Sequence, residues 1–136
     1  MDLWLRLGLA VAKFGSDLVV KALTDERWML TEDLLYDSDI LGLVTVPKWF
    51  ITDFASVPRL PLAYLLAGGT ANAAAVVHDW LYNTQPCTKL QADRVFREAM
   101  EVTGIAGWRK NLMFTAVVSG GWFTWWGYAS RKKRKN

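Results

Sequence analysis

The residues best suited to chemistry lie close together in the middle of the chain. His78 and Asp79 are adjacent, and Tyr82 follows one helical turn after His78. Asp93 lies eleven residues beyond Tyr82, in a segment that we expect to form the next helix. A histidine beside carboxylates can act as a general base, because a carboxylate that accepts a hydrogen bond from the ring fixes its tautomer. These four residues form the candidate site.

Two helices must position these side chains. The first is predicted to begin near Thr70, a residue that can cap a helix, and to run through an alanine-rich segment to Tyr82. The second is predicted to open at residues 88–91, Thr-Lys-Leu-Gln, which form a capping-box pattern, and to end at Gly104. The link over residues 83–87 is short, so the two helices should be antiparallel neighbours.

Helical spacing predicts which side chains face each other. Residues three and four apart share a face, so His78 lies with Ala74, Ala75 and Tyr82, and small alanines let a partner helix approach. One face of the second helix is predicted to carry Leu90, Asp93, Phe96, Arg97 and Met100. Asp93 then enters an apolar seam opposite His78. A buried carboxylate needs a partner, and His78 is the only histidine.

A second group of polar side chains lies among apolar residues between Phe50 and Pro58. Asp53 and Ser56 are costly there unless they are hydrogen-bonded, so both are candidate site residues. Asp53 is suited to bind a metal ion or to pair with His78. Its carboxylate is equally suited to cap the following turn by accepting backbone N–H groups.

A purely structural role for the central residues also fits the sequence. His78 and Asp93 would then form a buried hydrogen-bonded pair that fixes the register of the two helices. Alternatively, Asp93 would pair with Arg97 one turn along its own helix, and Asp79 would lie at the surface.

Composition limits the class of protein. The chain has 136 residues, of which 52% are apolar, so it is long enough for one folded domain and too apolar to be disordered. Its single cysteine, Cys87, excludes an intrachain disulfide and a multi-cysteine zinc site. Eight tryptophans are an unusually high number for this length.

The positive charge is concentrated at the C-terminus. The net charge is +3, but residues 131–135 alone carry five positive charges, which leaves 11 basic against 13 acidic residues elsewhere. A basic run of this kind binds anionic partners, including lipid head groups and nucleic acid, without selecting between them.

The rest of the chain predicts an α+β fold with a small N-terminal antiparallel sheet and a bundle of about three helices. Residues 3–14 resemble an amphipathic helix more than a signal peptide, because Arg6 and Lys13 interrupt the apolar run. Short β-prone runs follow at residues 18–20, 28–30, 34–36 and 43–46, separated by turn-rich segments. We expect an N-terminal helix over residues 1–16, one domain over residues 17–130 and a basic tail over residues 131–136.

The last predicted helix covers residues 107–130 and has two interpretations. Residues 111–129 form a run of 19 residues without a charge, which is long enough to span a membrane. Its aromatic residues before the basic tail, Trp122, Trp125, Trp126 and Tyr128, resemble an interfacial belt. The polar and glycine residues in the same run favour instead a helix that covers the core. A short helix is also expected at residues 60–66.

Three segments in order resemble an uncharacterised family that occurs in tailed bacteriophages and prophages. They are residues 52–59, Thr-Asp-Phe-Ala-Ser-Val-Pro-Arg; residues 75–82, Ala-Val-Val-His-Asp-Trp-Leu-Tyr; and residues 92–96, Ala-Asp-Arg-Val-Phe. The resemblance covers roughly residues 28–115. It implies a phage origin, in a virion or an infected cell, without supplying an activity.

The His-Asp-x-x-Tyr pattern with a distant Asp also resembles the core of secreted and parvoviral phospholipases A2. The resemblance implies that His78 is the base that activates a water and that Asp79 binds a divalent cation, calcium in those enzymes. It further implies that Asp93 and Tyr82 orient the histidine. The glycine-rich calcium loop of those enzymes has no counterpart before His78.

These observations lead to three functional hypotheses. The first is a phage-encoded hydrolase-like domain, with a lipid or ester substrate and a site formed by His78, Asp79, Asp93, Tyr82 and Asp53. The second is a non-enzymatic virion component, such as a tail, neck or ejection protein, whose partners are other phage structural proteins. The third is a small membrane-associated accessory protein.

Overall fold

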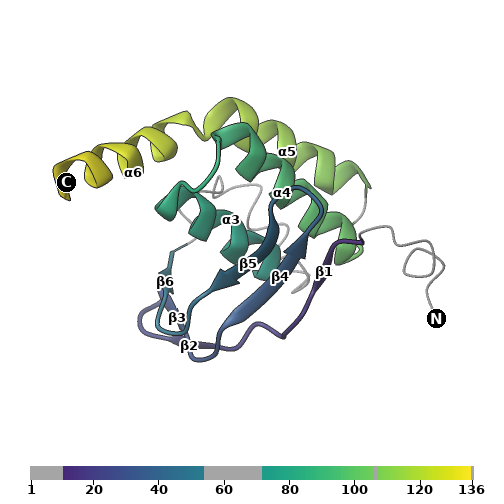
Figure 1. Cartoon of the computed structure of the whole chain (residues 1–136), viewed down its shortest axis with the longest axis horizontal. Helices are drawn as coiled ribbons and strands as arrows, with labels where there is room; N and C mark the ends of the chain where they lie inside the picture. The colour runs from purple at the N-terminus through teal and green to yellow at the C-terminus, as the bar shows by residue number, and fades with distance from the viewer. Residues whose placement is uncertain (1–10, 54–71, 106, 136) are drawn as a thin grey trace.

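The computed structural model describes residues 11–53, 72–105 and 107–135 (Figure 1). Within these residues, strands come first in the chain and helices follow, so the predicted α+β class is confirmed. The strands are β1 (Lys13–Phe14), β2 (Val20–Ala22), β3 (Trp28–Leu30), β4 (Leu34–Ser38), β5 (Gly42–Val46) and β6 (Ile51–Thr52). The helices are α3 (Asn72–Thr84), α4 (Lys89–Val102), α5 (Gly107–Gly120) and α6 (Trp122–Lys135).

The strands form two small antiparallel sheets where the sequence predicted one. The first sheet has the order β1-β4-β5, and the second has the order β2-β3-β6. In β4, Leu34 and Tyr36 are fully buried, and they pair with Val46 and Val44 of β5. This alternation puts one face of the sheet in the core, as the period of two in a strand requires.

The second sheet brings one site residue to the helices. Trp28 of β3 pairs with Thr52 of β6, and Thr52 is completely buried although it is polar. Its position beside α3 lets its hydroxyl reach the candidate site.

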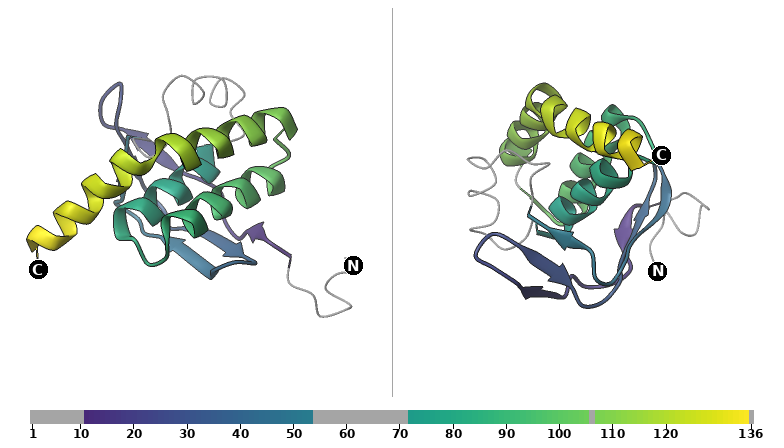
Figure 2. Two further views of the ribbon diagram at one scale, coloured as in Figure 1. Left: turned by 90° about the horizontal axis from the view of Figure 1, so that it is seen from above. Right: turned by 90° about the vertical axis from the view of Figure 1, so that its left-hand side faces the viewer.

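The helices form layers over the sheets, as Figure 2 shows from two further directions. The helix α3 contacts β5, and α4 contacts β1 and β4, so these two helices lie next to the strands. The helix α5 packs on α4, and α6 packs on α3. The site therefore lies inside the helical layers, where α3, α4 and the junction between α5 and α6 meet.

The predicted boundaries of α4 are confirmed by its caps. The Thr88 side chain accepts a hydrogen bond from the Gln91 backbone N–H, and the Gln91 side chain accepts one from the Thr88 backbone N–H. At the other end, Gly104 has a φ of 79°, which favours glycine and ends the helix. The capping box fixes the first turn of α4, which carries Lys89, and Asp93 follows one turn later.

The predicted buried face of α4 was wrong at two positions. Leu90 and Arg97 are exposed, whereas Asp93, Phe96 and Met100 are buried together with Lys89, Ala92, Val95 and Ala99. The helix is covered on one side by α3 and on the other by α5, so its buried stripe is rotated away from Leu90 and Arg97.

The last predicted helix is two helices, α5 and α6, separated at Gly121. Met113, Val117 and Tyr128 are buried on the inner side of this pair, which supports the interpretation as core-covering helices. None of the described helices has the length and apolarity needed to cross a membrane. The basic residues 131–134, predicted as a tail, belong to α6.

Two further predictions concern segments that the structure describes in part or not at all. The N-terminal helix expected over residues 3–14 was wrong at Lys13 and Phe14, which form β1 beside β4. Residues 3–10 of that prediction and the helix expected at residues 60–66 lie outside the described residues. The strand expected at residues 18–20 begins at Val20, two residues later.

Candidate functional site

Asp93 is the centre of a buried polar network. Its Oδ1 lies 2.8 Å from His78 Nε2 and accepts a hydrogen bond of 2.7 Å from the Tyr82 hydroxyl. Its Oδ2 accepts a hydrogen bond of 2.7 Å from Lys89 Nζ. Asp93, His78 and Tyr82 are completely buried. Three donors from two helices therefore converge on one carboxyl group.

The helical repeat explains how these groups meet. His78 and Tyr82 are one turn apart on α3, and Lys89 and Asp93 are one turn apart on α4, so each pair lies on one face. The His78 ring packs between two aromatic rings, with centroids 4.3 Å from Tyr82 and 4.7 Å from Phe96. The ring is therefore held by packing as well as by its hydrogen bond.

Lys89 connects this network to the end of α5. Besides its bond to Asp93, its Nζ donates to the carbonyl oxygens of Val117, at 2.7 Å, and Val118, at 3.2 Å. These carbonyls lie in the last turn of α5, and the Val117 oxygen also accepts a hydrogen bond of 3.0 Å from the Gly121 backbone N–H. The C-terminal end of a helix favours a nearby cation. The ammonium group thus satisfies the carboxylate and the helix end together.

The charges of the network follow from burial and hydrogen bonding. Burial alone would raise the pKa of Asp93, but the hydrogen bonds from His78, Lys89 and Tyr82 hold that pKa below its ordinary value. Burial lowers the pKa of His78 and outweighs the opposing effect of Asp93. We infer an ionised Asp93, paired with the Lys89 ammonium, and a neutral His78.

This charge state fixes the tautomer of His78. An ionised carboxylate can only accept hydrogen bonds, so His78 Nε2 must carry the proton that it shares with Asp93 Oδ1. In a neutral ring, Nδ1 then carries the lone pair. The hydrogen bond to Asp93 therefore prepares Nδ1 as the basic nitrogen.

Asp79, the residue that follows His78 on α3, belongs to a second buried network. Its Oδ2 accepts a hydrogen bond of 2.7 Å from Thr52 Oγ1, and its Oδ1 lies 3.4 Å from the Tyr128 hydroxyl of α6. Burial, followed by the negative charge of Asp79, raises the pKa of Tyr128. Asp79 is 1% exposed, so the alternative interpretation that placed it at the surface was wrong.

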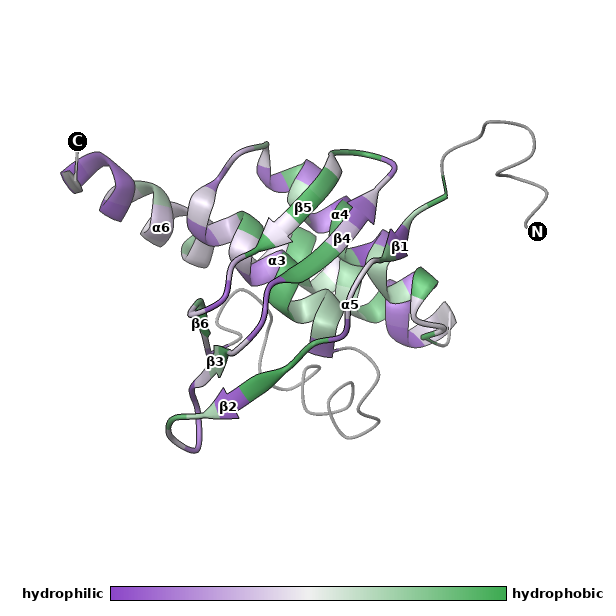
Figure 3. Ribbon diagram, turned by 60° about the horizontal axis from the view of Figure 1, so that its bottom comes forward, coloured by the Kyte–Doolittle hydropathy of each residue, from purple (hydrophilic) through white to green (hydrophobic). Residues whose placement is uncertain are grey.

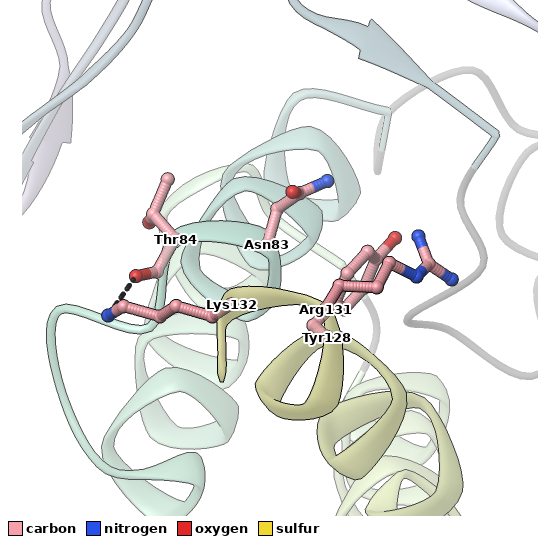
Figure 4. Close-up of a pocket in the computed structure, with 5 residues that line it drawn as sticks. All are labelled: Asn83, Thr84, Tyr128, Arg131 and Lys132. Carbon is pink, nitrogen blue, oxygen red and sulfur yellow. Dashed lines mark hydrogen bonds between the residues drawn. The ribbon is translucent and has the colours of Figure 1, made fainter. Parts of the chain in front are cut away.

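A cleft opens beside Tyr128, between the C-terminal end of α3 and α6 (Figure 4). It has a volume of about 340 Å³ and is lined by Asn83, Thr84, Tyr128, Arg131 and Lys132. The Lys132 ammonium donates to the Thr84 carbonyl oxygen at 3.2 Å, and the Arg131 guanidinium lies 4.9 Å from the Tyr128 ring centre. This basic cleft is separated from Asp79 by the Tyr128 side chain.

The described residues around Asp79 do not fit a calcium ion. Calcium takes six to eight oxygen ligands, whereas Asp79 is engaged by two hydroxyl groups that can donate to it. Within the described ranges, no group of three or more His, Cys, Asp or Glu side chains could hold a metal ion.

The structure brings together most of the predicted site residues. His78, Tyr82 and Asp93 form one hydrogen-bonded group, and Asp79 lies next to it in the sequence with partners of its own. Asp53 is exposed at the end of β6, next to Thr52 in the sequence. Ser56 lies outside the described residues.

Sequence reasoning missed Lys89, Thr52 and Tyr128. Lys89 and Asp93 are four residues apart, a spacing that indicates an ion pair on a helix. Only Arg97 was predicted as the helical partner of Asp93. Arg97 instead donates to the side chain of Asn111 on α5. Thr52 and Tyr128 carry no local signal, because they reach Asp79 from distant parts of the chain.

Comparison with known proteins gives a family but no activity. No curated protein matches the chain, and no solved structure matches it. Residues 28–117, which include β3–β6 and the candidate site, match the family described as "Protein of unknown function (DUF1353)". Since the match covers well over half of the chain, this protein belongs to the DUF1353 family.

Proposed function

We propose that this protein is a hydrolase-like domain in which His78 acts as a general base. The observation that carries the proposal is the concentration of buried polar groups. Six polar or charged residues are buried within residues 11–53, 72–105 and 107–135. Five of them belong to the two adjoining networks: Thr52, His78, Asp79, Lys89 and Asp93. Buried ionisable groups cost stability, and apolar side chains of similar size would often replace them without loss, so such a cluster points to a functional site.

The proposed reaction is attack of a water on an ester carbonyl carbon. His78 Nδ1 takes a proton from the water while the water oxygen bonds to the carbonyl carbon. Asp93 accepts the Nε2–H hydrogen bond and stabilises the imidazolium that forms. The imidazolium then gives its proton to the departing alkoxide oxygen, which leaves an acid, an alcohol and a neutral His78.

The proposed substrate is an ester of an anionic lipid. The cleft beside Tyr128 carries Arg131 and Lys132, whose positive charges suit a phosphate or carboxylate group. The neighbouring surface of α6 exposes aromatic side chains, which suit the apolar part of a lipid. An acyl chain and an anionic head group would therefore both find complementary surfaces near the site.

The test is hydrolysis of phospholipid vesicles and of short-chain chromogenic esters by the purified full chain. The wild type should release acid, and His78→Gln and Asp93→Asn should each lower the turnover rate by about 10²- to 10⁴-fold, the contribution of a general base. Reactions with added calcium and with EDTA would measure any dependence on a cation separately.

Cys87→Ser is the matched control, because Cys87 lies in the loop between the same two helices and has no proposed role. It should retain full turnover. Circular dichroism would establish that each variant is folded. A wild type without activity on any of these esters, or a His78→Gln variant as active as the wild type, would contradict the proposal.

A second candidate is a non-enzymatic virion component of a tailed phage. The complete burial of His78 and Asp93 favours it, since these side chains can also serve to fix the packing of the helices. The Lys89–Asp93 ion pair lies within α4, and Lys89 also donates a hydrogen bond to a carbonyl oxygen of α5. The phage origin is part of both proposals. Immunodetection of the protein in purified particles, with unchanged infectivity of a folded His78→Gln phage, would support this candidate over the hydrolase.

A further inference from the structure

The first turns of α6 expose an aromatic patch, formed by Trp122, Phe123 and Trp126. Their side chains are 44%, 82% and 55% exposed. The rings contact each other, with centroids 5.5 Å apart for Trp122 and Trp126 and 6.1 Å apart for Phe123 and Trp126. Three large aromatic side chains that touch at the surface form a contiguous apolar patch, which usually marks an interaction site.

The following turns of the same helix are strongly basic. Residues 102–136 contain seven basic residues, two at the start of α5 and five at the end of α6, and no Asp or Glu. The other nine basic residues therefore share the rest of the chain with all 13 acidic residues, which gives residues 1–101 a charge of −4. The positive charge is concentrated on the C-terminal helices.

The basic end of α6 stands away from the rest of the domain (Figure 1). Figure 3 shows this end as a hydrophilic segment that extends beyond the strands and the other helices. Lys132 and Arg131 are engaged with Thr84 and Tyr128, whereas Lys133 and Arg134 are exposed on the outer turns. The helix thus presents an aromatic segment and then a cationic segment to its surroundings.

We propose that α6 docks this protein on the surface of an anionic lipid bilayer. Aromatic side chains favour the boundary between head groups and acyl chains, where their rings are buried and water remains near. Basic side chains near an anionic surface contribute further attraction. The described helices include none suited to crossing the membrane, so the contact proposed is one of a helix lying at the surface.

The aromatic patch favours a bilayer over nucleic acid as the occupant. A single-stranded nucleic acid would need open ring faces on which bases can stack. One face of Trp122 is occupied by Lys89 Nζ, 4.9 Å from the ring centre, and Phe123 and Trp126 contact each other edge to face. The patch is therefore suited to insertion as an apolar unit. This inference is independent of the proposed hydrolysis.

The test is co-sedimentation of the full chain with vesicles of phosphatidylcholine containing phosphatidylglycerol, compared with pure phosphatidylcholine and with a single-stranded oligonucleotide. The wild type should bind the anionic vesicles most tightly. Neutralising Lys133→Gln or Arg134→Gln should weaken binding by about fivefold each, which corresponds to about 1 kcal/mol per charge. Phe123→Ser with Trp126→Ser should weaken it by at least about tenfold, because two apolar side chains lose their burial.

The matched control is Leu43→Ser with Trp49→Ser, which removes two exposed apolar side chains of β5 and the turn after it. This variant should bind vesicles like the wild type. Two results would overturn the proposal: no binding of the wild type to anionic vesicles, or binding that depends on Lys133 and Arg134 but not on the aromatic patch. Tighter binding to the oligonucleotide than to the vesicles would also overturn it.

Discussion

At the scale of single residues, the network around Asp93 is balanced in both charge and hydrogen bonding. Asp93 Oδ1 accepts from His78 and Tyr82, Oδ2 accepts from Lys89, and the remaining donors of Lys89 reach two carbonyl oxygens. Because Lys89 supplies the positive charge, His78 can stay neutral beside a carboxylate. This is the property that a general base requires.

Lys89 and Asp93 should be coupled in stability. Lys89→Met and Asp93→Asn each leave a buried charge without its partner, so each should lower the free energy of unfolding by about 3–5 kcal/mol. The double variant removes both charges. Its loss in the free energy of unfolding should be smaller than the sum of the two single losses by about 1–3 kcal/mol. Urea denaturation of the four proteins measures this coupling.

The surface ion pair between Lys110 and Glu101 is the control for that cycle. Its nitrogen–oxygen distance is 3.3 Å, but the Glu101 side chain is 68% exposed. Glu101→Gln should therefore change the free energy of unfolding by less than about 1 kcal/mol. Additive effects of Lys89→Met and Asp93→Asn would contradict the direct pairing of these two side chains.

The depressed pKa of His78 predicts a loss of stability in mild acid. In the unfolded chain His78 binds a proton near its ordinary pKa of 6.5, whereas the folded protein keeps the ring neutral. The unfolded state then binds more protons, so stability falls as the pH drops below about 6.5, by at most about 1.4 kcal/mol per pH unit. Unfolding free energies measured between pH 7.5 and pH 5 test this.

The lowered pKa of Asp93 adds a separate loss at lower pH. Asp93 in the unfolded chain takes up a proton near pH 3.8, whereas its pKa in the folded protein is lower. The contribution of Asp93 to the free energy of unfolding is therefore lost only as the pH falls below about 4. Since His78 is the only histidine, His78→Gln should remove the loss between pH 7.5 and pH 5 and leave the one near pH 4. An unchanged profile in His78→Gln would contradict a neutral His78 in the folded protein.

At the scale of elements, the close contact between α3 and the junction of α5 and α6 holds the site together. Gly121 lies at this junction, where a Cβ atom would stand 2.6 Å from the Tyr82 hydroxyl and 2.5 Å from the Val117 carbonyl oxygen. Both atoms belong to the network around Asp93. Only a residue without a side chain allows the backbone to approach this closely.

Gly121→Ala should therefore disturb both the packing of α6 and the hydrogen bond from Tyr82 to Asp93. The expected loss is about 1–3 kcal/mol in the free energy of unfolding, as for an overpacked core. Gly120→Ala is the matched control, because a Cβ atom there meets nothing within 4 Å. Chemical denaturation should show Gly120→Ala unchanged or more stable, and equal losses in the two variants would contradict the close approach at Gly121.

The elements also show what the sequence could predict. The capping box at Thr88 and the stop at Gly104 are local signals, and both mark the ends of α4 as predicted. The opposition of His78 and Asp93 followed from helical spacing and a short loop. The break at Gly121 and the rotated face of α4 depend instead on packing between α3, α4 and α5, which no local pattern contains.

At the scale of the whole molecule, the fold separates a buried polar network from an exposed aromatic and basic helix. The strands and the inner helices enclose the polar network, whereas α6 carries the aromatic patch and the basic residues. The C-terminal end of α6 extends away from the rest of the fold (Figures 1 and 3). The cleft lined by Tyr128, Arg131 and Lys132 lies between these two regions. A protein docked on a bilayer through α6 would hold this cleft close to the lipid surface.

The most direct test of a prepared base is nitrogen-15 NMR of the imidazole ring in uniformly labelled protein. With one histidine in the chain, the ring nitrogen signals need no assignment by mutation. The expected spectrum shows a protonated Nε2 and an unprotonated Nδ1 at pH 7, with the same pattern retained at pH 6. A ring protonated at Nδ1, or an imidazolium already formed at pH 7, would contradict the hydrogen-bond arrangement on which the proposed base depends.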